Sequence, residues 1–142
     1  QIIATRSSIS GAAGGCQAEI GSASSMAAGA LTYLQGGNCE QIATSAAMAM
    51  KNLLGLVCDP VAGLVEVPCV KRNVIGTVNA MACADMAMAG IVSRIPPDQV
   101  MDAMKEVGDK MDASLRETAL GGLAQTDEGM KIAEKMHASY EN

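Results

Sequence analysis

Large aromatic residues, which usually supply much of a protein core, are almost missing from this chain. Phe and Trp are absent from its 142 residues, and Tyr33 and Tyr140 are the only aromatic residues. Ala, Gly and Met carry the apolar fraction instead. Small facing side chains let helix backbones approach closely, and flexible Met side chains fill the gaps that remain. The composition therefore predicts tightly packed helices, in one domain whose core needs no disulfide or metal.

Glycine and proline residues mark where the predicted helices begin and end. Residues 7–15, "SSISGAAGG", predict a permissive loop, while Pro60 and Pro68 exclude regular helix around them. The predicted helices span about residues 17–35, residues 38–56 after an Asn38 N-cap and residues 71–93, followed by one beginning at Pro96-Pro97 and a short one capped by Thr126. No period-2 strand pattern occurs. We therefore predict an all-α fold, a compact bundle of about five helices with a proline-containing cysteine loop, in a single domain over residues 1–142.

Apolar residues three and four positions apart predict which side of each helix faces the core. The apolar positions are Ile42, Ala46, Ala49, Leu53 and Leu56 in one helix and the amphipathic stripe Val100, Met104, Val107 and Met111 in another, with Ile132, Ala133 and Met136 inward in the last. Met81, Asp85, Met88 and Val92 share one face of the helix over residues 71–93. We interpret the methionines as core residues rather than metal ligands.

The charge balance limits the classes of partner. A net charge of −5 and a pI near 4.7 argue against nucleic acid and anionic membranes, which attract basic proteins. Residues 20–39 are uncharged over the length of a membrane span, but their Ser, Thr and Gly content favours a buried helix of a soluble protein. Five cysteines without short regular spacing predict a reducing cytoplasm. No secretory signal is recognisable, and a start at Gln1 predicts a fragment or a processed product.

Three of the cysteines lie beside glycine or proline at the predicted ends of helices. Cys16 follows Gly14-Gly15, Cys58 follows a helix, and Cys69 precedes one. A helix N-terminus lowers the pKa of a nearby thiol, and Lys71 and Arg72 add positive charge. Three thiolates gathered in this way would suit an anionic iron–sulfur cluster with one open iron.

The spacing of these cysteines does not decide between two interpretations. It matches no ferredoxin or zinc-ribbon pattern, so five inert buried cysteines remain the alternative. Cys39 and Cys83 fall on regular helices, where nothing activates a thiol.

Three longer segments, "SISGAAGGCQAEIGSAS", "GLVCDPVAGLVEVPCVKRN" and "LRETALGGLA", closely resemble the alpha chain of the iron–sulfur-dependent L-serine dehydratases. The likeness runs from about Ser7 to Lys135 and corresponds to the C-terminal part of that subunit's all-helical catalytic domain. It implies a 4Fe–4S cluster held by Cys16, Cys58 and Cys69. It also implies elimination of water from L-serine, with an open iron as Lewis acid on the hydroxyl, to give pyruvate and ammonia in amino-acid catabolism and gluconeogenesis.

The sequence departs from the family pattern in three respects. The family's proposed base lies in a Ser-Ser-Ser-His-Thr motif on the beta chain or domain, which is absent here, and we expect the only histidine, His137, on a solvated helix. The first half of the alpha subunit is also absent. We therefore predict that this chain is inactive alone and works in an oligomer with a beta chain or domain. The chain ends in Tyr140-Glu141-Asn142, without the final cysteine of single-chain relatives, so no C-terminal iron ligand is expected.

Substrate-binding candidates surround the three segments, whereas the catalytic base is not identified in this chain. The candidates are Ser8, Ser10, Gly11, Lys71, Arg72 and Arg116. Each has a structural alternative: a glycine-rich turn for the first three, an exposed helix start for Lys71 and Arg72, and an Arg116–Glu117 pair. Glu19 is interpreted as a helix-start carboxylate and Asp59 as a turn residue before Pro60.

Two rival functions are compatible with the sequence. One is a non-catalytic helical scaffold whose cysteines are structural. The other is a related lyase that acts on L-cysteine or L-threonine.

Overall fold

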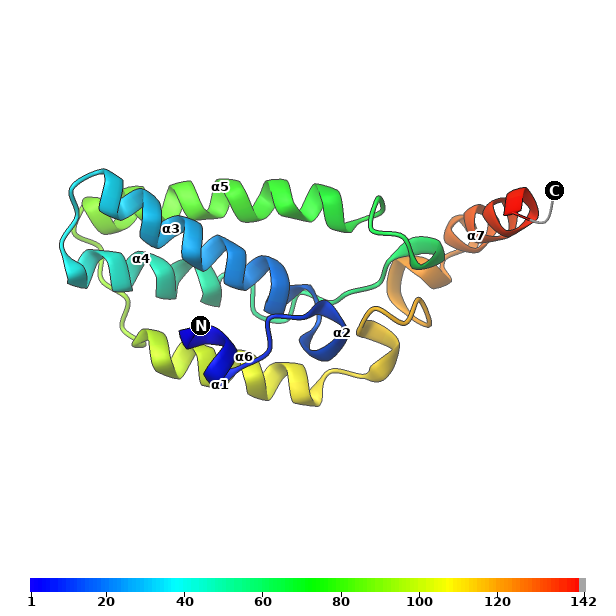
Figure 1. Ribbon diagram of the computed structural model, residues 1–142, viewed down its shortest axis with the longest axis horizontal. Coiled ribbons are helices and arrows are strands. Elements are labelled where there is room, and N and C mark those ends of the chain that lie inside the picture. Colours follow the sequence, from blue (N-terminus) through cyan, green and yellow to red (C-terminus); the bar gives the residue numbers. More distant parts are fainter. Residues whose placement is uncertain (141–142) are drawn as a thin grey trace.

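The computed structural model describes residues 1–140, and every regular element in that part of the chain is helical (Figure 1). The α-helices are α1 (Ile2–Arg6), α2 (Gly11–Gly14), α3 (Ser22–Leu34), α4 (Cys39–Lys51), α5 (Cys69–Met88), α6 (Pro97–Lys110) and α7 (Asp127–Tyr140). A π-helical turn, η1 (Gln17–Gly21), and three 3-10 turns, η2 (Val61–Gly63), η3 (Ala113–Leu115) and η4 (Gly122–Gln125), connect them. The predicted all-α class is confirmed.

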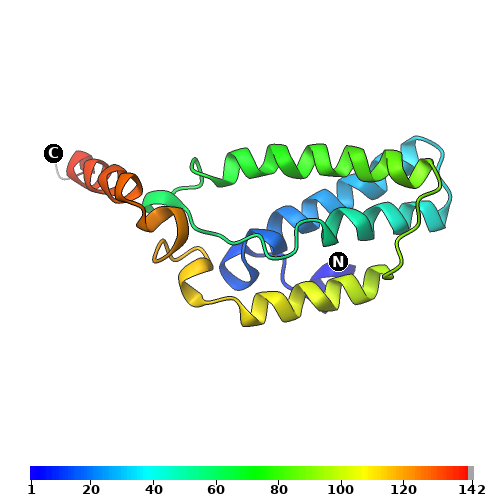
Figure 2. The same cartoon turned by 180° about the vertical axis from the view of Figure 1, so that it is seen from behind.

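Four helices form the body of the molecule. Helix α3 packs against both α4 and α5, and α6 lies along α4, with α1 packed against α6. Helix α7 extends away from this bundle and packs mainly against the connecting turns η2 and η4 (Figures 1 and 2). None of the helices in residues 1–140 combines the length and apolar character needed to cross a bilayer.

The predicted cap at Asn38 is confirmed and explains where α4 begins. The Asn38 side chain accepts a hydrogen bond from Gln41 N, and the Gln41 side chain accepts one from Asn38 N, both at 2.9 Å. This reciprocal pair satisfies two backbone donors at the helix start. The helix ends at Lys51, earlier than the predicted residue 56, and the chain then turns through Gly55 at a φ of +87°.

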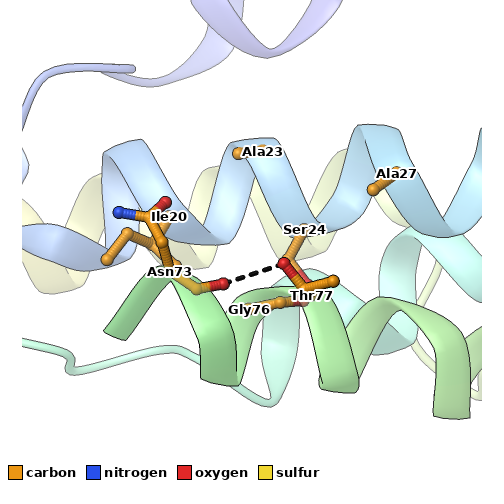
Figure 3. A pocket seen from close by; sticks show the side chains of 7 residues that line it. All are labelled: Ile20, Ala23, Ser24, Ala27, Asn73, Gly76 and Thr77. Carbon is orange, nitrogen blue, oxygen red and sulfur yellow. Dashed lines mark hydrogen bonds between the residues drawn. The ribbon is translucent and has the colours of Figure 1, made fainter. Parts of the chain in front are cut away.

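Small side chains form the contact between α3 and α5, as the composition predicts. Figure 3 shows Ser24 and Gly76 facing each other there, with Ser24 Oγ donating a 2.7 Å hydrogen bond to the Gly76 carbonyl. A Cβ atom at Gly76 would lie 2.8 Å from Ile20 Cγ2. Glycine at this position therefore sets how closely the two helices approach.

The predicted core position of Met81 on α5 is wrong. Met81 and Asp85 are exposed, and the buried residues of α5 are Cys69, Gly76, Ala80, Cys83, Ala84 and Ala87. On α5 small residues face inward and Met81 points out, whereas Met86 is partly buried against the core. On α6, by contrast, Val100 and Met104 are buried as predicted.

Three smaller differences concern helix boundaries and exposure. The predicted loop over residues 7–15 contains the short helix α2, and α5 runs over 69–88 rather than 71–93. Val92 lies beyond α5 and is exposed, as is Ile132 on α7. Glu141 and Asn142, on which the expectation about a C-terminal iron ligand depends, lie outside the described residues.

Candidate metal centre

The thiols of Cys16, Cys58 and Cys69 meet in one buried cluster. Cys16 lies between α2 and η1, Cys58 in the segment between α4 and η2, and Cys69 at the first residue of α5. The three Sγ atoms all lie within 4.8 Å of one another, and Cys16 Sγ is 3.8 Å from Cys69 Sγ. Cys83 is buried elsewhere, in the contact between α3, α4 and α5, and Cys39 is exposed.

Gly15 allows Cys16 to reach the cluster. Its φ is +75°, and a Cβ atom there would lie 2.7 Å from Met111 Sδ and 2.9 Å from the Leu56 carbonyl oxygen. The same carbonyl accepts a 2.8 Å hydrogen bond from Gln17 N. This region is therefore held directly against the end of the segment that follows α4.

Cys58 is held by the "LRETALGGLA" segment. Its N–H donates to the Leu115 carbonyl, and its own carbonyl accepts from Glu117 N, each at 2.8 Å. These two bonds form an isolated parallel bridge opposite Arg116, and Glu117 has a φ of +65°. The two hydrogen bonds hold the backbone around Cys58 against this segment. The segment therefore has a structural role beside the thiols.

A buried ion pair closes the cluster. Arg72 Nη1 lies 2.7 Å from Asp59 Oδ1, 2.8 Å from the Val57 carbonyl oxygen and 3.9 Å from Cys16 Sγ. Asp59 is therefore more than the turn residue that the sequence predicted. An Asp next to a cysteine and an Arg in the following helix are visible in the sequence. That Asp59 pairs with Arg72 depends on the fold.

Burial raises the pKa of the Cys69 thiol to about 11 and that of the Cys58 thiol still further. The predicted lowering is therefore wrong for the metal-free thiols at these two positions. Desolvation is the largest cause at both positions, and Arg72 opposes it only in part at Cys69. A metal ion binds thiolates, so it would replace these protons on binding.

The donor set fits a thiolate-bound metal group. Soft thiolate ligands select zinc, copper(I) or iron–sulfur groups. Two thiolates on one tetrahedral ion, with metal–sulfur bonds of about 2.3 Å, lie about 3.8 Å apart. Cys16 Sγ and Cys69 Sγ are buried and 3.8 Å apart, the spacing of two thiolates on one shared ion. In a 4Fe–4S cluster each thiolate binds a different iron, so the three thiols would have to move apart to hold one.

Among the predicted substrate-binding residues, Gly11 lies at the cluster. A Cβ atom at Gly11 would be 3.4 Å from Cys58 Sγ, 3.4 Å from Glu19 Oε2 and 3.6 Å from Glu117 Oε2. The two carboxylates therefore face the same small space beside the thiols. From the sequence, only a helix-start role is expected for Glu19 and an ion pair with Arg116 for Glu117.

The other candidates have different surroundings. Ser8 Oγ accepts a 3.0 Å hydrogen bond from Ser10 N, and Ser8 lines a separate pocket toward α6. Lys71 is exposed on the first turn of α5. Arg116 is half-buried, and the alternative pairing with Glu117 does not occur among the ion pairs of residues 1–140. Arg72 is the one cationic candidate within reach of a cluster thiol.

Residues 1–124 match the family described as "Serine dehydratase alpha chain". The chain belongs to this family. It is 61% identical over 135 residues to "Probable L-serine dehydratase, alpha chain" of Bacillus subtilis (strain 168), covering 95% of this chain and 45% of that protein. Against a protein of the same name from Latilactobacillus sakei it is 60% identical over 131 residues, 92% of this chain and 63% of the relative.

A third serine dehydratase relative is "L-serine dehydratase, alpha chain" of Peptoniphilus asaccharolyticus. It is 53% identical over 132 residues, which cover 93% of this chain and 45% of the relative. The chain thus spans about half the length of the curated alpha chains it matches. The resemblance expected from the three segments is confirmed at the level of the family.

Proposed function

We propose that this chain is the metal-binding part of an L-serine dehydratase, an enzyme that converts L-serine to pyruvate and ammonia. The convergence of three buried thiols from positions 16, 58 and 69 is the observation that carries the proposal. The names of the alpha-chain relatives support L-serine as the substrate. Because the chain spans about half of those relatives, the activity belongs to the complete protein.

The proposed metal group is a 4Fe–4S cluster bound by Cys16, Cys58 and Cys69. Three cysteines supply one ligand fewer than the number of irons, so one iron has no ligand from this set. When bound, the group supplies a Lewis acid for the substrate hydroxyl. The chain's own residues hold the thiols together, keep water from the sulfurs and place Gly11, Glu19 and Glu117 beside them.

The reaction also needs groups that we assign to other parts of the enzyme. Serine must lose its Cα proton and its β-hydroxyl, and the resulting enamine must be hydrolysed to pyruvate and ammonia. His137 is exposed on α7, outside the thiol cluster, so it does not offer a base there. We assign the base to the beta chain or domain, and we expect an oligomeric, cytoplasmic enzyme in which this chain alone is inactive.

Turnover by the assembled enzyme tests the proposal. The complete alpha chain and its partner, loaded anaerobically with iron and sulfide, should form pyruvate from L-serine. Cys58→Ser should abolish this activity, and Cys83→Ser, a buried cysteine outside the cluster, should retain it. A faster reaction with L-threonine or L-cysteine would reassign the substrate, and an iron-free, inactive assembly would favour a helical scaffold.

A further inference from the structure

One side chain joins all three cysteine-bearing segments. Arg72 lies in the first turn of α5, three positions after Cys69. Its Nη1 donates to the carbonyl of Val57, the residue before Cys58, at 2.8 Å, and lies 3.9 Å from Cys16 Sγ. A single guanidinium nitrogen therefore connects the segments that carry Cys16, Cys58 and Cys69.

A buried partner fixes the position of this guanidinium. Asp59 Oδ1 accepts from Arg72 Nη1 at 2.7 Å, and Asp59 Oδ2 accepts from Leu123 N at 2.8 Å. The side chain of Arg72 is only 15% exposed and that of Asp59 only 4%. Such a pair, hydrogen-bonded at both oxygens, holds its geometry more firmly than a solvent-exposed ion pair. The Arg72 guanidinium is thus kept beside the thiols.

The contact between Arg72 Nη1 and Cys16 Sγ is mainly electrostatic rather than a full hydrogen bond. Nη1 carries two protons, and the oxygens at 2.7 and 2.8 Å take them before the sulfur at 3.9 Å. A cation at this distance favours the thiolate over the thiol, and it favours the more negative, reduced state of a thiolate-bound metal group. Outer-shell partners of metal ligands typically change metal affinity by about 10–100-fold.

We propose that Arg72 is a positioning residue of the metal centre: it fixes the three cysteine segments around the metal and raises the reduction potential of the bound group. This inference rests on the proposed metal centre and is independent of the identity of the substrate. It also differs from the substrate-binding role that the sequence allowed for Arg72, because a substrate anchor acts on the substrate and leaves the metal unchanged.

Two variants separate the effect of the Arg72 charge on the metal from an effect on folding. Arg72→Lys keeps the charge but cannot bridge the same acceptors. Removing only one member of a buried ion pair can unfold a protein, so the charge is removed with the double variant Asp59→Asn/Arg72→Gln, which keeps a neutral polar pair. Arg94→Gln is the matched control, because it removes an exposed arginine beyond the opposite end of α5.

The experiment uses the complete alpha chain assembled with its partner and loaded anaerobically with ferrous iron and sulfide. Iron retention against a graded chelator gives the affinity, and spectroelectrochemical titration gives the reduction potential. We expect about a 10–100-fold loss of affinity and a lower potential in the double variant, and a smaller effect in Arg72→Lys. Arg94→Gln should change neither quantity.

The possible results distinguish this inference from the function on which it rests. If wild type takes up no iron, the metal centre itself is wrong. If wild type loads iron and both variants match its affinity and potential, the role of Arg72 is wrong while the metal centre stands. A variant that changes only the KM for L-serine would likewise overturn the inference and favour a substrate anchor. If the double variant does not fold, Arg72→Lys decides between these results.

Discussion

Asp59 and Leu123 are joined by a 2.8 Å hydrogen bond, from the Leu123 N–H to the Asp59 carboxylate, across 64 positions of the sequence. The bond connects the cysteine loop to the "LRETALGGLA" segment. Gly122 makes this approach possible, because its φ is +59° and a Cβ atom there would collide with the Asp59 carboxylate. The glycine pair of that segment therefore has a packing role at the metal centre.

Gly122→Ala should destabilise the protein by about 2–3 kcal/mol, from a positive-φ cost of about 1–2 kcal/mol and displacement of Asp59. Urea unfolding measures this loss. Gly63→Ala is the matched control, because Gly63 also has a positive φ, +74°, but nothing lies within 4 Å of its added Cβ. Equal losses for the two variants would mean that the Asp59 contact contributes nothing.

Asn38→Ala should cost about 1 kcal/mol of stability, because it removes the acceptor for Gln41 N at the start of α4. Asn38→Asp should retain wild-type stability, since Asp is an equally good N-cap. Thermal unfolding followed by circular dichroism compares the three proteins. A loss in Asn38→Asp as large as that in Asn38→Ala would show that the cap is not the source of the effect.

Local sequence signals located most of the helices. Asn38 and Pro96-Pro97 act through bonds and dihedral preferences within a few residues, so their effect can be predicted without knowing the fold. The core face of α5 could not be predicted in this way. Ala80, Ala84 and Ala87 are buried because two neighbouring helices approach closely, and that approach is a property of the assembled bundle.

In the candidate site, too, some features could be predicted from the sequence and others depend on the fold. Spacing alone left Cys16, Cys58 and Cys69 open to an inert interpretation, and the family resemblance selected them. The pairing of Asp59 with Arg72, and the position of Glu117 beside Cys58, depend on how three distant segments meet. The pKa values of the Cys58 and Cys69 thiols also differ from the prediction, because helix termini and nearby cations are visible in the sequence whereas burial is not.

The contact between α1 and α6 should depend on pH. Arg6 donates hydrogen bonds to Asp102, and this holds the pKa of the Asp102 carboxyl below its ordinary value of 3.8. A lowered pKa in the folded state means that the pair stabilises the contact fully above about pH 4 and loses this effect as the pH falls through the lowered value. We expect faster amide exchange in α1 well below pH 4, measured relative to the intrinsic exchange rate at each pH.

Arg6→Gln should produce the same fast exchange in α1 at neutral pH. Lys131→Gln removes an exposed cation on α7, where it pairs with Glu128, and should leave α1 unchanged. NMR-detected hydrogen exchange compares the proteins. Exchange in α1 that is the same in wild type and Arg6→Gln would exclude a contribution from this ion pair.

The central claim is that three distant thiols hold one metal group, and anaerobic reconstitution with iron and sulfide tests it most directly. Cys16→Ser, Cys58→Ser and Cys69→Ser should each prevent stable formation of a brown, oxygen-labile species, whereas Cys83→Ser should form it as wild type does. Iron and sulfide content and visible absorption measure the outcome. Wild-type iron content in the three cluster variants, or a colourless wild type with a normally folded chain, would contradict the account.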